Sequence, residues 1–217
     1  MIYHMNRIKQ DVRVCVDQNR NTDALFEAAD IDSLTLDEVI ESKVLEAVER
    51  VHKSAPYDLL ELGHNFGTTG LFWGDMESGW VVLPSDFMRL VVFQMSDWER
   101  PVYSAISATD PEYKRQRSRI KGLRGNAQRP VCAIGMRPEG KVLEFYSCKD
   151  VNAQVMTAVY MPFPKIVNNN CVDISERCYD AVIYTAAGLA LISCGETDKA
   201  KVLLETANSL LGNGRQS

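Results

Sequence analysis

The stretch GWVVLPSDFMRLVVFQMSDW, residues 79–98, decides the fold class of this chain. It contains two short runs rich in Val and Phe, at 80–84 and 89–96, separated by a Pro-Ser-Asp break, and this pattern is typical of strands joined by a turn. Four more runs of the same kind follow, at 102–107, 130–136, 141–147 and 154–161. No helix-period segment of ten residues separates the runs, so we expect an antiparallel sheet or small sandwich rather than βαβ units.

Helical patterns flank this β-rich part on both sides. Thr35 and Glu38 have capping-box spacing and open an amphipathic helix that ends before Pro56. Residues 174–193 are apolar on most faces, which predicts a buried central helix, and Gly195 separates it from a last amphipathic helix at 197–214 with Gly212 at its C-cap. The first 30 residues show no strong period, and five glycines between 63 and 79 predict turns and bent strands.

The predicted fold class is therefore α+β, with an N-terminal helix and a C-terminal helix pair forming a helical body that carries an inserted antiparallel β-sheet or sandwich. We place the helical body at 1–62 and 171–217 and the inserted β subdomain at 63–170. The length of 217 residues suits one globular unit with such an insert, and 46% apolar residues with a net charge of −5 argue against disorder. We expect no membrane segment and no secretory signal, since no run approaches the ~20 apolar residues of a membrane helix.

A basic arm at 111–129 is the main candidate site. Between 114 and 129 the chain has seven basic residues and no acidic one. Like charges at this density predict an exposed arm or long loop between two strands. Such an arm suits docking on an acidic protein neighbour, contact with DNA phosphates, or a solvated loop with no partner. The candidate interface residues, for subunit or portal docking or for DNA contact, are Lys114, Arg115, Arg117, Arg119, Lys121 and Arg124.

Catalytic chemistry has little support in the sequence. Cys132 and His64 form an imaginable nucleophile–base pair, but nothing in the sequence sets their geometry. Asp86, Asp97 and Glu99 suggest an acidic metal site, but rim positions on strands whose apolar residues pack inward explain them better. The six cysteines contain no CxxC pair and are interpreted as buried free thiols. We expect no enzymatic activity, no catalytic residues, no metal and no cofactor.

The order of short motifs along the chain resembles one family. The resemblance is carried by LPSDFMRLVVFQMSDWERPV (83–102), PEYKRQ (111–116), PVCAIG (130–135), KVLEFYS (141–147), AVYMPFP (158–164), AAGLAL (186–191) and DKAKVLLETANSLL (198–211). This succession looks like the phage head–tail connector proteins: the adaptors of short-tailed phages called tail tubular protein A or gatekeeper, and the ring proteins of crAss-like phages. The correspondence runs from about Leu34 to Leu211; residues 1–30 and the Gly63–Gly79 segment match nothing in the family pattern.

The resemblance implies a structural virion protein, made in the host cytoplasm and located at the head–tail junction. It implies a homo-oligomeric ring, commonly dodecameric, below the portal protein and above the next tail or ring protein. Double-stranded DNA would pass through its channel during genome ejection. The residues alone leave a second interpretation open, a nucleic-acid-binding or general protein-interaction module that uses the basic arm; a hydrolase with a cysteine nucleophile is a third.

Overall fold

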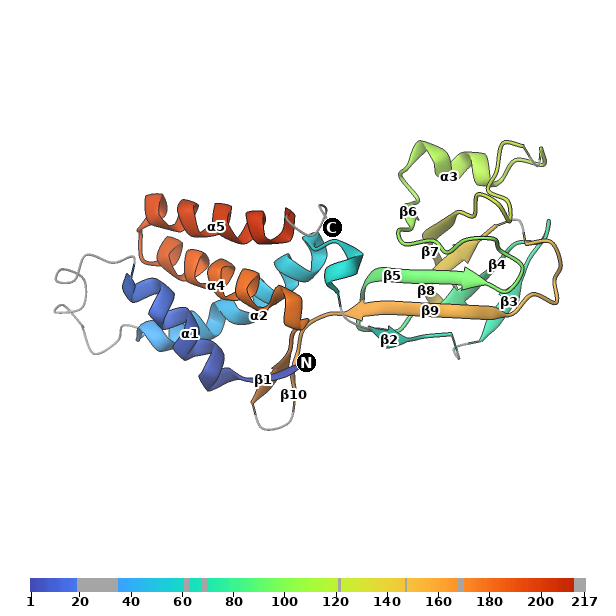
Figure 1. The fold of residues 1–217 in the computed structure, drawn as a ribbon. Coiled ribbons are helices and arrows are strands. Elements are labelled where there is room, and N and C mark those ends of the chain that lie inside the picture. The colour runs from blue at the N-terminus through green and yellow to red at the C-terminus, as the bar shows by residue number, and fades with distance from the viewer. Residues whose placement is uncertain are drawn as a thin grey trace. The chain divides into compact units, whose positions relative to one another are not determined.

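The chain forms an α+β fold in which a sheet-containing unit is inserted into a helical unit (Figure 1). The computed structural model describes residues 1–18, 35–60, 63–67, 70–120, 122–146, 148–167 and 170–212. The helical unit comprises Met1–Glu61 and Pro164–Ser217, and the insert comprises Leu62–Phe163. The second boundary therefore falls before Pro164, whereas we expected it after residue 170.

The helical unit is built on α1 (Met5–Gln18), α2 (Leu36–Ser54), α4 (Tyr179–Ser193) and α5 (Thr197–Gly212), with the short 3-10 turns η1 (Tyr57–Leu59) and η2 (Glu176–Cys178). Helix α4 packs against α1, α2 and α5 and is buried on most faces, which confirms the predicted central helix. Our prediction started this helix at 174, but the segment before Tyr179 forms η2.

Helix α2 begins as its sequence predicts. The side chain of Thr35 accepts a hydrogen bond from the backbone N–H of Glu38, and the Glu38 carboxylate accepts one from the backbone N–H of Thr35 at 2.8 Å. This capping box satisfies two backbone groups that the first helical turn leaves without partners. Hydrogen bonds from Thr35 lower the pKa of the Glu38 carboxyl group.

Helix α1 is an element that our sequence analysis did not predict. Its buried residues are Met5, Ile8, Val12 and Val16, spaced three and four apart as one face of a helix requires. Lys9 of α1 pairs with Glu41 of α2 at 2.8 Å. The helical body therefore has one more helix than expected.

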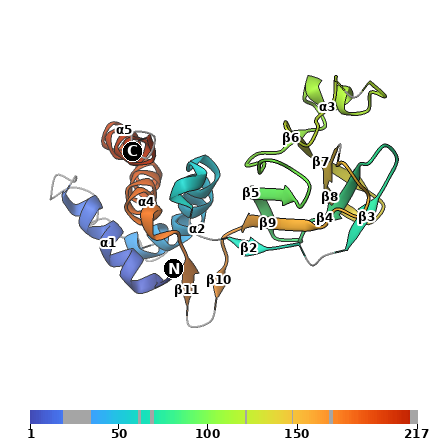
Figure 2. The same ribbon diagram turned by 45° about the vertical axis from the view of Figure 1, so that its right-hand side comes forward.

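A small antiparallel sheet in the helical unit explains why the insert ends earlier along the chain than the sequence predicts. Its strand order is β1 (Ile2–His4), β11 (Cys171–Asp173) and β10 (Ile166–Val167), and Figure 2 shows β11 beside β10. Because β10 pairs with β11, the chain rejoins the helical unit directly after Phe163. The strand pairs are too short to show a period in the sequence.

The insert contains two sheets that enclose one core. The first has the order β2 (His64–Asn65), β9 (Val155–Pro162) and β5 (Phe87–Met95); the second has the order β3 (Leu71–Trp73), β4 (Gly79–Val82), β8 (Gly140–Phe145), β7 (Cys132–Arg137) and β6 (Ile106–Ser107). The pairings are antiparallel as predicted, except that β6 runs parallel to β7. The predicted RPEG turn at 137–140 joins β7 and β8.

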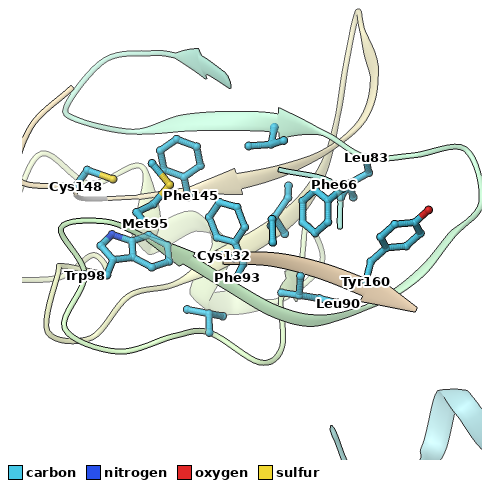
Figure 3. Packing of buried hydrophobic residues seen from close by; sticks show 14 of the residues in the cluster. Phe66, Leu83, Leu90, Phe93, Met95, Trp98, Cys132, Phe145, Cys148 and Tyr160 are labelled. Atoms are coloured by element: carbon cyan, nitrogen blue, oxygen red, sulfur yellow. The ribbon is translucent and has the colours of Figure 1, made fainter. Parts of the chain in front are cut away.

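Aromatic rings from both sheets fill this core (Figure 3). Phe66 and Phe93 stack with centroids 6.1 Å apart, and Phe93 lies 5.9 Å from Phe145 of the second sheet. Gly79 is required beside this core, since an added Cβ would lie 2.3 Å from the Phe72 carbonyl oxygen and 2.5 Å from the Phe145 ring. Each aromatic ring buries about 150–250 Å², and stacked and edge-to-face pairs add to the stability of the core beyond this burial.

Candidate functional site

The basic segment folds as a short helix and a closed loop on the insert (Figures 1 and 2). Helix α3 (Pro111–Gln116) starts at an Asp110 N-cap whose side chain accepts from the Glu112 N–H at 2.8 Å, with Pro111 at the first helical position. Of the six candidate cations, Lys114, Arg115, Arg117 and Arg119 are exposed and Arg124 is buried, while Lys121 lies outside the described residues. The expectation of an open arm therefore needs revision.

Tyr113 anchors α3 on the second sheet. Its hydroxyl donates to Glu144 Oε2 at 2.9 Å, and the Tyr146 hydroxyl donates to the same oxygen at 2.6 Å. Arg137 donates to Oε1 through Nε at 3.0 Å and through its terminal nitrogen at 2.8 Å. The Glu144 side chain is only 6% exposed, so these four contacts satisfy a carboxylate that has left water.

The same contacts set the titration of this carboxylate. Burial acts to raise the pKa of Glu144, but the hydrogen bonds from Tyr146, Tyr113 and Arg137 outweigh it, and the pKa falls below its ordinary value. Burial and the bond to Glu144 raise the pKa of Tyr146. Glu144 is therefore an ionised acceptor at neutral pH, and it ties α3 to the sheet.

The loop that follows α3 is closed at its base. The buried Gln116 accepts a hydrogen bond from the Gly125 backbone N–H at 2.7 Å, which joins the two ends of the loop. Next to this closure, Asn126 and Arg129 exchange backbone hydrogen bonds at 3.1 and 3.0 Å. Buried and mutually satisfied polar contacts of this kind hold a loop in one shape.

Arg124 is a correction to the predicted interface. Its side chain is 3% exposed and pairs with Glu77 at 3.3 Å, 47 positions earlier in the chain. A buried cation needs such a partner, because desolvation without one is strongly unfavourable. Arg124 therefore fastens the loop to the β3–β4 turn and does not offer its charge to a partner.

A pocket of about 400 Å³ lies beside this ion pair. Its lining combines the Arg124–Glu77 pair with a Lys149–Glu99 pair at 3.8 Å, so the formal charges of the pocket cancel. Cys148 also lines it, and burial, followed by the charge of Asp97, raises the pKa of its thiol to about 12. That thiol is protonated at neutral pH and is a poor nucleophile.

The outer part of the loop carries two apolar side chains that our sequence analysis did not single out. Ile120 is 64% exposed and Leu123 is 55% exposed, and the Leu123 N–H donates to the Ile120 carbonyl at 3.0 Å. They lie in a segment whose other large side chains are cationic. The sequence does contain a signal for this surface, since two branched apolar residues occur inside a run of basic ones.

The imagined nucleophile–base pair is not supported by burial. Cys132 lies in the core of the insert, and burial raises the pKa of its thiol well above the ordinary value. His64 is exposed on β2, and its ring centroid lies 5.9 Å from that of Tyr160 in an edge-to-face arrangement. A fully buried thiol of this kind lacks both the thiolate and the access that nucleophilic catalysis requires.

The three acidic residues suggested as a metal site have separate partners. Asp86 accepts a hydrogen bond from the Tyr160 hydroxyl at 2.7 Å, Asp97 accepts one from the Lys149 backbone N–H, and Glu99 pairs with the Lys149 side chain. Across the residues the structure describes, no three His, Cys, Asp or Glu side chains gather closely enough to hold a metal ion.

Comparisons with known proteins do not assign this chain to a family. Neither the models of known protein families nor the curated proteins include a match to this sequence. Within the described ranges, no helix has both the length and the apolar character needed to cross a bilayer.

Proposed function

We propose that this chain is a structural subunit of a phage head–tail connector, which assembles as a ring and has no enzymatic activity. The observation that carries the proposal is the basic loop. Its base is held by three sets of side-chain contacts, and four of its six candidate cations are exposed. A loop held rigidly while it presents charge and apolar groups suits a permanent protein contact, because little conformational entropy is lost on docking.

The division of charge between the two units supports assembly. The helical unit contains 12 basic and 19 acidic residues, net −7, whereas the insert contains 12 basic and 10 acidic residues, net +2. Opposite charge on two parts of one chain favours head-to-tail contacts between copies. Such heterologous contacts close into a ring when the rotation between neighbours allows.

The resemblance in motif order suggests where in the virion the proposed ring would lie. The family pattern implies a position below the portal protein, contact with the next tail or ring protein, and passage of double-stranded DNA through the channel. The acidic balance of the whole chain, net −5, suits a channel through which DNA must slide, since a basic wall would bind phosphates.

Sedimentation velocity of the purified 24.4 kDa chain across a concentration series tests the proposal, with electron microscopy of any large species. We expect a closed assembly, of about 290 kDa if twelve copies take part. A chain that stays monomeric at every concentration, and also when mixed with a portal protein from the same virus, would contradict a connector role.

A DNA-binding module is the second candidate, favoured by the exposed cations Lys114, Arg115, Arg117 and Arg119. It predicts duplex affinity that falls with salt by a slope of about −0.9 per phosphate contact. If the chain does not bind duplex DNA even at about 50 mM salt, the low end of the usual salt range, the DNA-binding candidate is excluded.

A further inference from the structure

The outer part of the basic loop has the composition of a contact surface without its partner. Ile120 and Leu123 expose more than half of their area, although the loop base is fixed by the Gln116–Gly125 hydrogen bond. Arg119 is exposed beside them. We define the loop tip as Arg119, Ile120 and Leu123: two apolar side chains with an adjacent cation.

The outer face of helix α5 carries an exposed apolar residue with two acidic neighbours and one cation, Lys201. Residues Asp198, Val202 and Glu205 follow one another at intervals of four and three, so they share one side of the helix. All three are exposed, and Val202 exposes 58% of its area. The buried residues of α5, which pack toward α4, fall on the other side: Ala200, Leu203, Ala207 and Leu211.

We propose that the loop tip of one copy docks on the outer α5 face of a second copy. In this contact Ile120 and Leu123 cover Val202, and Arg119 lies against the carboxylates of Asp198 and Glu205. The apolar parts would leave water together, and the flanking charges would set the register. This inference rests on the proposed ring, for which it names the contact between neighbours.

The choice of a second copy as the partner follows from charge. The charged residues of segment 114–129 are all basic, and the unit that carries α5 is acidic, net −7, although α5 itself has as many lysines as acidic residues. A contact from the loop of one copy to α5 of another uses two different surfaces. It leaves one of each free on every end copy, so it propagates until the assembly closes.

Charge exchange tests the contact in the full chain. We expect Glu205→Lys and Arg119→Glu each to weaken self-association about tenfold in sedimentation velocity, because each places like charges together. The double variant has the pair reversed and should regain most of the affinity, to within about threefold of the original.

Two matched controls change charge equally at exposed positions elsewhere. Glu139→Lys on the β7–β8 turn and Arg100→Glu after β5 should leave self-association within about twofold of the original chain. Ile120→Ser together with Leu123→Ser should weaken association without any change of charge. Circular dichroism melting of every variant separates lost contact from lost folding.

The outcomes distinguish this inference from the proposed function. If Glu205→Lys and Arg119→Glu form rings as well as the original chain, the proposed contact is wrong but the connector role stands. The same conclusion follows if the double variant assembles worse than both single variants. A chain that never self-associates overturns the contact, and the connector role is then decided by mixing with the portal. Duplex DNA or anionic vesicles that bind through Arg119, with no effect of Glu205→Lys, would assign the tip to those partners instead.

Discussion

Glu144→Gln tests whether one buried carboxylate holds the basic loop on the sheet. The substitution keeps the shape of the side chain but removes the charge that accepts from Tyr113, Tyr146 and Arg137. A hydrogen bond to a charged group contributes about 1.5–3 kcal/mol and one between neutral groups about 1. Weakening two phenol bonds therefore costs about 1–4 kcal/mol.

The ion pair adds less than the phenol bonds. The Arg137 side chain is 37% exposed and lies over the Trp80 ring, 4.1 Å from its centroid, so water and the ring stabilise its charge when Glu144 is neutralised. We assign about 0.5–1 kcal/mol to this contact, as for partly exposed pairs. The sum is about 1.5–5 kcal/mol of unfolding free energy at pH 7, and relaxation around the site lowers the loss within this range.

Urea unfolding of the full chain at pH 7 measures this difference, with tryptophan fluorescence as the probe. The matched control is Glu139→Gln, the same chemical change at an exposed turn position five residues earlier, which should alter stability by less than about 0.5 kcal/mol. Tyr113→Phe should show about half of the Glu144→Gln loss, and the two changes together should be less than additive.

The pH dependence gives an independent test of the same carboxylate. Its pKa is lowered in the folded chain, so the unfolded state binds the proton more readily and stability falls as pH drops through the folded pKa. The original chain should therefore lose stability between pH 5 and pH 3, about the range of a carboxyl group, more steeply than Glu144→Gln does. Equal stability of the two chains at pH 7, or parallel pH curves, would refute the role we give to Glu144.

Three further substitutions and reactions test the fold on which the loop depends. Gly79→Ala should destabilise the insert by about 2–3 kcal/mol, because the added Cβ meets the Phe72 carbonyl and the Phe145 ring. Gly122→Ala is the control: no atom lies within reach of its added Cβ, so the unfolding free energy should change by less than about 0.5 kcal/mol. Thr35→Ala should cost about 1 kcal/mol in thermal unfolding through loss of the α2 cap, and a cost below about 0.3 would contradict the capping box. Cys132 and Cys178 should resist iodoacetamide in the native chain at pH 7.5, about one unit below the pKa of a free thiol, and should react after denaturation. If mass spectrometry finds them labelled in the native chain, they are not buried as described.

Long, strongly patterned elements were predictable from the sequence. Helix α2 shows both its cap and its apolar stripe, and α4 is apolar on nearly all faces, so local pattern and tertiary position agree. The strand runs around Phe93 and Phe145 are confirmed because their β-branched and aromatic residues suit a core between two sheets.

Shorter or mixed elements were not predictable in the same way. Helix α1 buries Met5, Ile8 and Val12 on one face, but the polar and charged residues between them lower the average apolarity of the segment and obscure the helical period. Strands β10 and β11 contain two and three residues, which is below the length at which alternation can be recognised. Strand β11 also pairs with β1, from the opposite end of the sequence, and no local pattern indicates that partner.

The basic loop shows why charge alone did not predict the site. A run of cations predicts mutual repulsion and exposure, and for Lys114 and Arg119 that holds. For Arg124 a carboxylate 47 positions away reverses the outcome, and no local pattern encodes a partner at that distance. The sequence therefore predicts which residues carry charge, whereas the long-range partners Glu77 and Glu144 decide which of them remain available. Those two acids hold Tyr113 and Arg124, which flank Ile120 and Leu123 along the chain, so the contacts that remove Arg124 from the surface also limit where these two exposed apolar residues can lie.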